Sequence, residues 1–357
     1  MTILGYGKTC PRSISGPQRP TGLHLGNYTM SIKTYLYENK YTKNIYRKLR
    51  RDYIQKHYLT GEHEFINRSE GHEKLCLVLA GYKNYLIPAV MGRLKMFAPE
   101  DMDICIITSG KWSEEINKLC EENNWSYLST KRNNVALAQN MGIELHKKAK
   151  YIFKLDEDIF LTEKYFERMY ETYKECKKSS DYNIGVLAPL LPINGYGHFK
   201  LINKFGLTDM YRKKFGDLKI AAGIDRAIEN SPELAKFMWG EAIMVDGKEY
   251  RLPTIDEMNR KLSEEEAEVE ACPIRFSIGA ILFERKLWKA MGYFKVDNGA
   301  GMGRDEAQLC SYCLLESRPV MVSSNILVGH LAFGSQNESM REYLEKHPEI
   351  FLPPKAK

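Results

Sequence analysis

The chain has 357 residues, of which 43% are hydrophobic and 27% are charged, and its formal net charge is +6. This composition is ordinary for a globular protein and excludes a mostly disordered, collagenous or fibrous chain. The length is enough to bury a full core, either as one large α/β domain with extensions or as two domains of roughly 150 residues each. The mild positive charge is compatible with anionic ligands, nucleic acid or an acidic membrane face, and it singles out none of them.

Residues 1–72 form a predicted N-terminal extension that is partly helical and basic. Residues 1–30 are punctuated by Gly and Pro, which indicates irregular chain, and they hold no apolar run of the signal-peptide type. No run of about 18 apolar residues occurs in the sequence, so we expect a cytoplasmic protein without a transmembrane helix. Residues 44–57 predict a basic helix with Lys48, Arg50, Arg51 and Lys56. Its basic side chains indicate either a solvated face or a peripheral contact with the inner face of a membrane.

From residue 75 onward the sequence alternates between predicted strands and helices. Short apolar runs predict buried strands, and longer periodic segments between them predict helices. The strands are expected at 75–80, 103–107, 126–129 and 151–155, and the helices at 87–96, 113–122 and 134–148. This alternation predicts βαβ units and an α/β fold with a mostly parallel central sheet flanked by helices. Ligands are then expected at the carboxyl ends of the strands.

The second half of the chain predicts further elements of the same domain. We expect helices at 160–178, 284–291 and 307–315, and strands at 185–191 and 320–328, the second ending at Gly329-His330. Residues 276–283 are again apolar. Residues 194–270 form a predicted insertion, read as Gly/Tyr/Phe-rich loop with a helix at 231–239, a hairpin around 245–248 and an acidic run at 264–270. The predicted main domain therefore covers 73–335, and residues 336–357 form a polar tail with a short helix.

Two acids follow directly after the predicted strand at 151–155. Asp156 and Asp158 are two residues apart, and extended geometry points such residues to the same side. A pair of carboxylates suits Mg²⁺ or Mn²⁺, and such a metal usually accompanies a phosphate group. The alternative is a helix N-terminus, where acids are favoured in the first turn. Taken alone, the Asp-x-Asp pattern leaves both interpretations open.

Three segments, in the right order, resemble the family 2 glycosyltransferases, which have the GT-A fold. Ala138, Gln139, Asn140 and Gly142 hold the places of a helical motif in which Arg is common where Gln139 stands, and the strand ending in Asp-x-Asp follows it. Residues 276–294 resemble the acceptor-side segment of that family, and residues 305–309 resemble its Glu-Asp-x-x-Leu motif. Residues 301–306 also resemble the Gly-Trp-Gly-Gly-Glu-Asp segment of β-galactosyltransferases. The resemblance covers about residues 75–334 and implies a GT-A glycosyltransferase.

The resemblance implies roles for individual residues. Asp156 and Asp158 would hold Mn²⁺ or Mg²⁺, and His330 would be a third ligand, although a lone His at a strand end often has no such role. Glu306 matches the catalytic base and Asp305 the acid that contacts the acceptor. Because the order of these acids is swapped, either can be the base, and Glu306 is favoured. The nucleotide of the donor is expected at Ala80, Tyr82, Lys83, Thr108, Asn134, Ala138, Asn140 and Asp156, with Tyr82 stacking on the base and Lys83 near a phosphate.

The predicted function is metal-dependent, inverting transfer of a sugar to a hydroxyl of a glycan or glycolipid. Inverting transfer needs a base for the acceptor hydroxyl and positive charge for the departing nucleoside diphosphate. UDP is the commonest nucleotide in the family, and no nucleic-acid partner is expected. Residues 15–28 resemble the signature of tryptophanyl-tRNA synthetases, which would imply an ATP-using enzyme, but the partner Lys-Met-Ser-Lys-Ser loop is absent. The sequence is also compatible with an inactive GT-A-like binding protein and with a nucleotidyltransferase.

Overall fold

The computed structural model describes residues 36, 39–179, 181–301, 303–331 and 336–354. By its contacts the chain divides into two units, Met1–Arg51 and Asp52–Lys357. The predicted basic helix is present as α2 (Lys43–Ile54), and a π-helical turn, Gln55–Leu59, follows it. The irregular chain predicted for 1–30 and the synthetase-like signature at 15–28 lie outside the described residues. None of the helices in the described part of the chain combines the length and the apolar composition that crossing a membrane requires.

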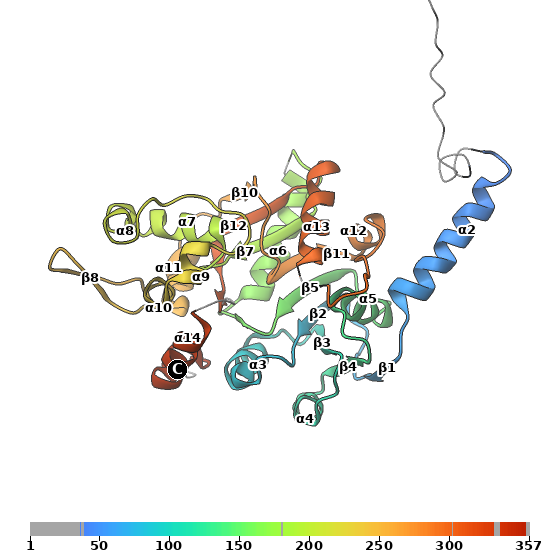
Figure 1. Ribbon diagram of the computed structural model, residues 1–357, viewed down its shortest axis with the longest axis horizontal. Helices are drawn as coiled ribbons and strands as arrows, with labels where there is room; N and C mark the ends of the chain where they lie inside the picture. Colours follow the sequence, from blue (N-terminus) through green and yellow to red (C-terminus); the bar gives the residue numbers. More distant parts are fainter. Residues whose placement is uncertain (1–35, 37–38, 180, 302, 332–335, 355–357) are drawn as a thin grey trace, which may run out of the picture. The chain divides into compact units, whose positions relative to one another are not determined.

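The second unit is built on a mixed sheet with the strand order β1-β4-β3-β2-β5-β11-β7-β12-β10 (Figure 1). Strands β4, β3, β2 and β5 run parallel, and β7 runs parallel to β12. Strand β11 lies antiparallel between β5 and β7, and the edge strands β1 and β10 are antiparallel to their neighbours. The strands are β1 (His63–Ile66), β2 (Lys74–Leu79), β3 (Met102–Ser109), β4 (Ser126–Thr130), β5 (Tyr151–Asp156), β7 (Val186–Leu190), β10 (Val269–Ala271), β11 (Ala280–Glu284) and β12 (Val320–Leu327).

The predicted α/β fold with a parallel core is confirmed, and β1 extends it toward the N-terminus. Strand β1 lies within the predicted extension of residues 1–72 and pairs with β4. The sheet therefore begins before residue 73. A short antiparallel pair outside the main sheet joins β6 (Ile159–Phe160) to β13 (Gly329–His330). This pair brings Gly329 and His330, which follow β12, beside the residues that directly follow Asp158.

Helices cover both faces of the sheet because the parallel strands are apolar on both sides. In β5, Phe153 packs against Tyr165 and Phe166 of α6 (Tyr165–Ser179). The alternation of side chains sends Lys154 to the opposite face, beside its register partner Leu77. Helix α5 (Val135–Leu145) packs on that face at Gly142, where an added Cβ would lie 2.6 Å from Ile107. Only glycine permits this close approach of α5 to β2 and β3.

The helices of the βαβ units agree with their predicted positions, apart from the ends of α5 and α6. Helix α5 ends at Leu145 instead of Lys148, because the His146 ring donates to the Gly142 carbonyl that would otherwise accept the backbone N–H of residue 146. Helix α6 begins at Tyr165 and not at residue 160, because the preceding residues form β6. The helices of this half are a 3₁₀ turn (Asn84–Leu86), α3 (Ile87–Phe97), α4 (Glu114–Glu122), α5 and α6.

The Gly/Tyr/Phe-rich loop predicted within residues 194–270 is wrong at its start, where residues 195–204 and 208–215 are helical. Helices occupy much of the insertion, together with the predicted hairpin of β8 (Ile243–Val245) and β9 (Lys248–Tyr250). The side chain of Asn194 caps α7, and an added Cβ at Gly195 or Gly197 would lie 2.2 or 2.3 Å from a backbone carbonyl oxygen. The glycines therefore permit close packing and do not mark a loop. The helices are α7 (Gly195–Lys204), α8 (Thr208–Phe215), α9 (Arg226–Asn230), α10 (Pro232–Met238) and α11 (Ile255–Ser263).

The C-terminal residues, predicted as a polar tail, fold into α14 (Asn337–Lys346) and α15 (Pro348–Phe351) and pack on the core. The ring of Phe351 is fully buried and stacks on Trp239 at 4.6 Å. The buried guanidinium of Arg93 donates to the Phe351 carbonyl at 2.7 Å and forms a two-point ion pair with Asp256 at 2.8 Å. A buried guanidinium needs such partners, so α3 anchors the end of the chain.

Candidate active site at the carboxyl ends of the strands

A cavity of about 380 Å³ lies at the carboxyl ends of β2, β3 and β5, which is where open α/β sheets bind ligands. Its lining brings together residues predicted from distant parts of the chain: Ala80, Tyr82, Asp156, Asp158, Asp305, Glu306 and His330. The lining also includes Lys154 and Glu157, for which no role was predicted. The predicted residues Lys83, Thr108, Asn134, Ala138 and Asn140 do not line this cavity.

Asp156 ends β5 and faces the cavity from a partly buried position. The ammonium of Lys154, two residues earlier on the same face of the strand, lies 2.5 Å from Asp156 Oδ1 and donates to the Ile278 carbonyl at 2.9 Å. Burial raises the pKa of Asp156, and the Lys154 ammonium opposes that change. Burial lowers the pKa of Lys154, but Asp156 and the nearby Asp305 more than offset this, so the pKa ends above its ordinary value.

Asp158 is buried and has two cationic or potentially cationic partners. Lys83 Nζ lies 2.5 Å from Asp158 Oδ2 and also 3.3 Å from the Leu331 carbonyl oxygen. His330 Nε2 lies 3.4 Å from Asp158 Oδ1, at the end of β13. Burial by itself would raise the pKa of Asp158, but His330 and Lys83 hold it below its ordinary value. Asp158 is therefore an ionised carboxylate with one oxygen bound by Lys83.

The middle acid of the Asp-Glu-Asp run holds the loop that follows β2. Glu157 Oε2 accepts hydrogen bonds from the backbone N–H groups of Gly81, Tyr82 and Lys83, at 2.8, 2.9 and 3.0 Å. Gly81 has a φ of +110°, a conformation that a residue with a Cβ rarely adopts. Sequence reasoning missed this role, although a third acid directly after a buried strand was the available signal. Glu157 therefore connects the predicted nucleotide loop to the acids of the predicted metal site.

Two predicted base-binding residues differ in their exposure. Tyr82 is 57% exposed, and its hydroxyl donates to the Ser109 carbonyl at 2.5 Å while the Lys111 ammonium lies 4.6 Å from its ring centre. Thr108 is fully buried, and its hydroxyl donates to the Lys111 carbonyl at 2.7 Å. Tyr82 is thus placed at the cavity, whereas Thr108 shapes the loop behind it.

The predicted residues of α5 make their contacts within the protein. Asn134 caps the helix by accepting from Leu137 N at 2.9 Å, and it donates to the Gly299 carbonyl at 2.7 Å. Asn140 accepts from Trp288 Nε1 at 2.8 Å and exchanges two hydrogen bonds with the backbone of Phe294. These contacts hold two segments against α5. One is the chain around Phe294, which follows α12 (Arg285–Ala290), and the other is the chain around Gly299. The assignment of Asn134, Ala138 and Asn140 to the donor nucleotide stays a prediction.

The two acids of the predicted base motif lie in the first turn of α13 (Arg304–Leu315), which begins three residues earlier than predicted. Asp305 is buried, and its carboxylate accepts from Gln139 Nε2 at 2.7 Å and from the Glu306 backbone N–H at 2.9 Å. Glu306 lines the cavity, and its Oε1 lies 3.0 Å from Nε of Arg275. Burial raises the pKa of Glu306, and Arg275 opposes that change.

The donor chemistry at Asp156, Asp158 and His330 fits a divalent cation such as Mn²⁺ or Mg²⁺, since carboxylates and imidazole are ligands of these metals. Lys154 binds Asp156 Oδ1 and Lys83 binds Asp158 Oδ2, and the other oxygen of Asp158, Oδ1, lies 3.4 Å from His330 Nε2. Within the described residues, no three His, Cys, Asp or Glu side chains are already gathered around one point. The acids are held by ammonium groups instead.

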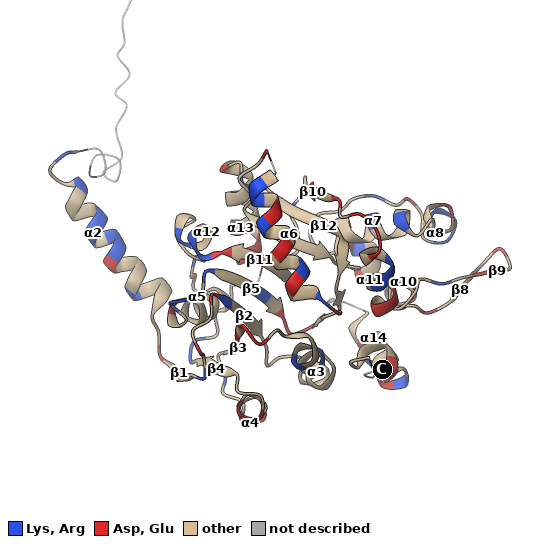
Figure 2. Cartoon of the chain, turned by 180° about the vertical axis from the view of Figure 1, so that it is seen from behind, with Lys and Arg blue, Asp and Glu red and all other residues tan. Residues whose placement is uncertain are grey.

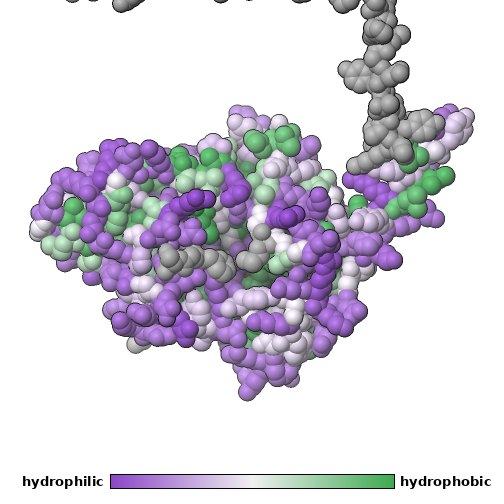
Figure 3. Space-filling model, in the orientation of Figure 1, coloured by the Kyte–Doolittle hydropathy of each residue, from purple (hydrophilic) through white to green (hydrophobic). Residues whose placement is uncertain are grey.

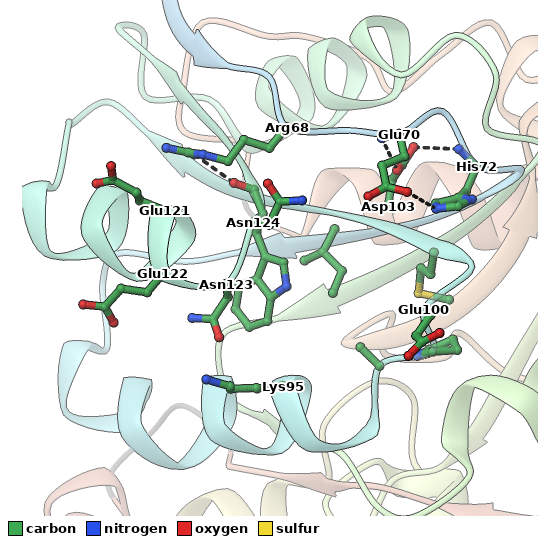
Figure 4. Close-up of a pocket in the computed structure, with 15 residues that line it drawn as sticks. Arg68, Glu70, His72, Lys95, Glu100, Asp103, Glu121, Glu122, Asn123 and Asn124 are labelled. Carbon is green, nitrogen blue, oxygen red and sulfur yellow. Dashed lines mark hydrogen bonds and ion pairs between the residues drawn. The ribbon is translucent and has the colours of Figure 1, made fainter.

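A second cavity, of about 500 Å³, lies at the opposite ends of the parallel strands, beside the start of β3 (Figure 4). Its most buried acid, Asp103, accepts from the backbone N–H groups of Glu70, Gly71 and His72 at 2.9, 3.1 and 3.0 Å. This carboxylate therefore organises the turn before β2. None of the predicted site residues lines this cavity, so the candidate chemistry belongs to the first one.

No protein-family model and no curated protein matches this sequence. Among solved structures, the chain is similar to the one described as the crystal structure of GalNAc-T7 with UDP, GalNAc and Mn²⁺, at 12% sequence identity and a TM-score of 0.44. The similarity covers 81% of this chain and 53% of that one. The chain therefore spans about half the length of the structure that it matches.

Proposed function

We propose that this protein is a GT-A glycosyltransferase that moves a sugar from a nucleoside-diphosphate donor, UDP-sugar first among the candidates, to a hydroxyl of a glycan or glycolipid. The observation that carries the proposal is the arrangement of acids around one cavity. Asp156 and Asp158 follow the central parallel strand, and Asp305 and Glu306 approach the same cavity from α13. One pair suits a diphosphate-bound cation and the other suits a base, which is the division that glycosyl transfer needs.

On the donor side, Asp156, Asp158 and His330 would hold Mn²⁺ or Mg²⁺. When bound, that ion supplies positive charge that offsets the charge of the diphosphate. Tyr82 offers an exposed ring for the nucleobase, and Glu157 holds the loop that carries this ring. The donor is thereby expected to lie across the ends of β2 and β5, with its sugar directed toward α13.

On the acceptor side, Glu306 would act as the base. Its carboxylate takes the proton of an acceptor hydroxyl, whose oxygen then forms a bond to the anomeric carbon. The bond between that carbon and the diphosphate oxygen breaks, and the nucleoside diphosphate leaves with the electron pair. Attack opposite to the leaving group inverts the anomeric centre. The raised pKa of Glu306 makes it a stronger base than an ordinary glutamate.

We further propose that α2 contacts an anionic membrane surface. Ile45, Leu49 and Tyr53 recur every fourth residue on one side of the helix and are 62%, 63% and 57% exposed. Lys48 and Arg50 are also exposed. Figure 2 shows basic residues along α2, and Figure 3 shows apolar residues among them. An apolar stripe with basic neighbours is typical of helices that lie in a lipid interface, where a glycolipid acceptor would be found.

The test of the glycosyltransferase proposal is a thermal-shift panel with UDP, GDP, CDP, TDP and ATP, each with and without MnCl₂. A ligand present at about one hundred times its Kd stabilises the folded state by about 2.7 kcal/mol. We expect a metal-dependent shift with one nucleoside diphosphate, lost in Asp158→Ala. The matching sugar nucleotide should then release that nucleoside diphosphate in the presence of an acceptor. Release of pyrophosphate would indicate a nucleotidyltransferase, and a shift with ATP alone that Asp158→Ala leaves unchanged would overturn the proposal.

A further inference from the structure

The two acids at the predicted metal site are each paired with a buried lysine. The side chains of Lys83 and Asp158 are 6% and 2% exposed, and their charged atoms are 2.5 Å apart. The side chain of Lys154 is 3% exposed, and it lies equally close to Asp156. Each ammonium has a backbone carbonyl as a further acceptor, from Leu331 for Lys83 and from Ile278 for Lys154. Such contacts are needed, because an unpaired ammonium in a protein interior is strongly unfavourable.

The two lysines place one positive charge beside each of the two acids. Asp156, which is half-buried, and Asp158, which is buried, are close in sequence and in space. Two such carboxylates repel each other unless positive charge lies between or beside them. That charge comes from Lys83 and Lys154, one ammonium for each carboxylate. A divalent cation would bring the same amount of positive charge to the same two acids.

We propose that Lys83 and Lys154 are internal counter-cations that compete with the divalent cation for Asp158 and Asp156. The inference rests on the proposed function, since it takes these acids as the metal ligands. An ammonium and a metal ion that share a carboxylate lie a few ångströms apart, and their repulsion opposes simultaneous binding. Metal binding is therefore coupled to a weakening of both lysine contacts. The carbonyl acceptors, Leu331 and Ile278, remain available to the two ammonium groups.

The two lysines differ in what they face once their contacts weaken. Lys154 lines the cavity, whereas Lys83 does not. Lys154 thus lies beside the space where the diphosphate of the donor is expected. A diphosphate there would attract both the metal ion and the ammonium that the metal repels. Metal ion and nucleoside diphosphate should then bind with positive coupling, each raising the affinity of the other.

The direct test measures MnCl₂ binding to the full chain without nucleotide, by the electron paramagnetic resonance signal of free Mn²⁺. In Lys154→Met and in Lys83→Met we expect the Kd for Mn²⁺ to fall by about tenfold, because a nearby like charge has been removed. Lys154→Arg keeps the charge and should bind Mn²⁺ as the wild type does. Lys150→Met is the matched control, since Lys150 forms an exposed ion pair with Glu73 and should leave the Kd unchanged.

A second readout is the melting temperature in EDTA and in MnCl₂. Both Met variants should melt at lower temperature than the wild type in EDTA, because each leaves a carboxylate of the site without its ammonium partner, and MnCl₂ should restore more of that loss than it adds to the wild type. Weaker or unchanged Mn²⁺ binding in the Met variants would overturn the inference, and weaker binding would indicate that the lysines orient the ligands. If Lys154→Met does not fold, Lys83→Met carries the same prediction.

The outcomes separate this inference from the proposed function. Tighter Mn²⁺ binding in the Met variants, without any effect of UDP or another nucleoside diphosphate, would support the counter-cation role and contradict the transferase. Metal-dependent UDP binding in the wild type, with unchanged Mn²⁺ affinity in the Met variants, would support the transferase and contradict the counter-cation role. In the wild type, UDP should also lower the Kd for Mn²⁺, and this coupling should shrink in Lys154→Met.

Discussion

The side-chain amide of Gln139 donates a hydrogen bond of 2.7 Å to the carboxylate of Asp305. This contact joins α5 to the first turn of α13 across two segments that are far apart in the sequence. The other carboxylate oxygen of Asp305 accepts from the Glu306 backbone N–H. Asp305 is therefore occupied within the protein, whereas Glu306 pairs with Arg275, a half-exposed side chain that a substrate can displace. This difference favours Glu306 as the base.

Replacing Glu306 with Gln should lower the rate of sugar transfer by about 100-fold or more, because the amide cannot take the acceptor proton. The Kd of the donor nucleotide should stay near the wild-type value, since the proposed function assigns Glu306 to the acceptor. Asp305→Asn should instead lower thermal stability, as its amide would face the amide of Gln139. Measured kcat and nucleotide Kd for both variants show which of the two acids is the base. A catalytic defect confined to Asp305→Asn would exchange the two roles.

The transfer rate should depend on pH through Glu306. Burial raises the pKa of this group above its ordinary value of 4.5, and Arg275 opposes the increase. A base acts in its ionised form, so kcat/KM should be full above the raised pKa and fall as the pH drops through it. Arg275→Met removes the opposing charge and should move this acid limb to higher pH. Arg341→Met, which removes an exposed arginine of α14, is the control. An acid limb that Arg275→Met leaves in place would contradict the assignment.

Asn140→Ala should destabilise the protein by about 2 to 3 kcal/mol, because it leaves the Trp288 Nε1–H and the Phe294 N–H without their buried acceptor. Urea unfolding measures this change. The Kd of the donor nucleotide should be unchanged in the folded variant if Asn140 acts only through these contacts. A variant of wild-type stability with weakened nucleotide binding would show that Asn140 contacts the donor, as the resemblance to family 2 implies.

The full chain should sediment with vesicles that contain phosphatidylserine and remain in solution with phosphatidylcholine alone. Binding should weaken as salt is raised, because screening reduces the attraction between basic side chains and anionic headgroups. Exchanging Ile45 and Leu49 together for Ser should reduce binding, as should Lys48→Gln with Arg50→Gln. Met244→Ser changes another exposed apolar residue and is the matched control. Absence of binding to anionic vesicles at low salt would end the membrane proposal.

Much of the local structure could be predicted because it depends on short-range patterns. The apolar runs that became β2, β3, β5 and β7 bury both faces, and Ser113 and Ser231 cap α4 and α10 at the predicted starts of those helices. The insertion was misread where glycine served close packing, at Gly195 and Gly197, instead of a turn. Nothing local distinguishes these two uses of glycine, because the carbonyls of Ala221 and Leu191 that decide between them lie in other elements.

The candidate site, like the fold, could be predicted from the sequence only in part. Its acids could be named from the sequence because they follow a buried strand or begin a helix, and both positions are visible in local patterns. Their partners could not be named: Lys83 meets Asp158 across 75 positions of the chain, and Gln139 meets Asp305 across 166. Contacts over such separations form only when the sheet order and the helix packing are complete. The residue types present at the site therefore follow from the sequence, whereas their pairing and charge balance follow from the folded chain, because burial and proximity are properties of the assembled core.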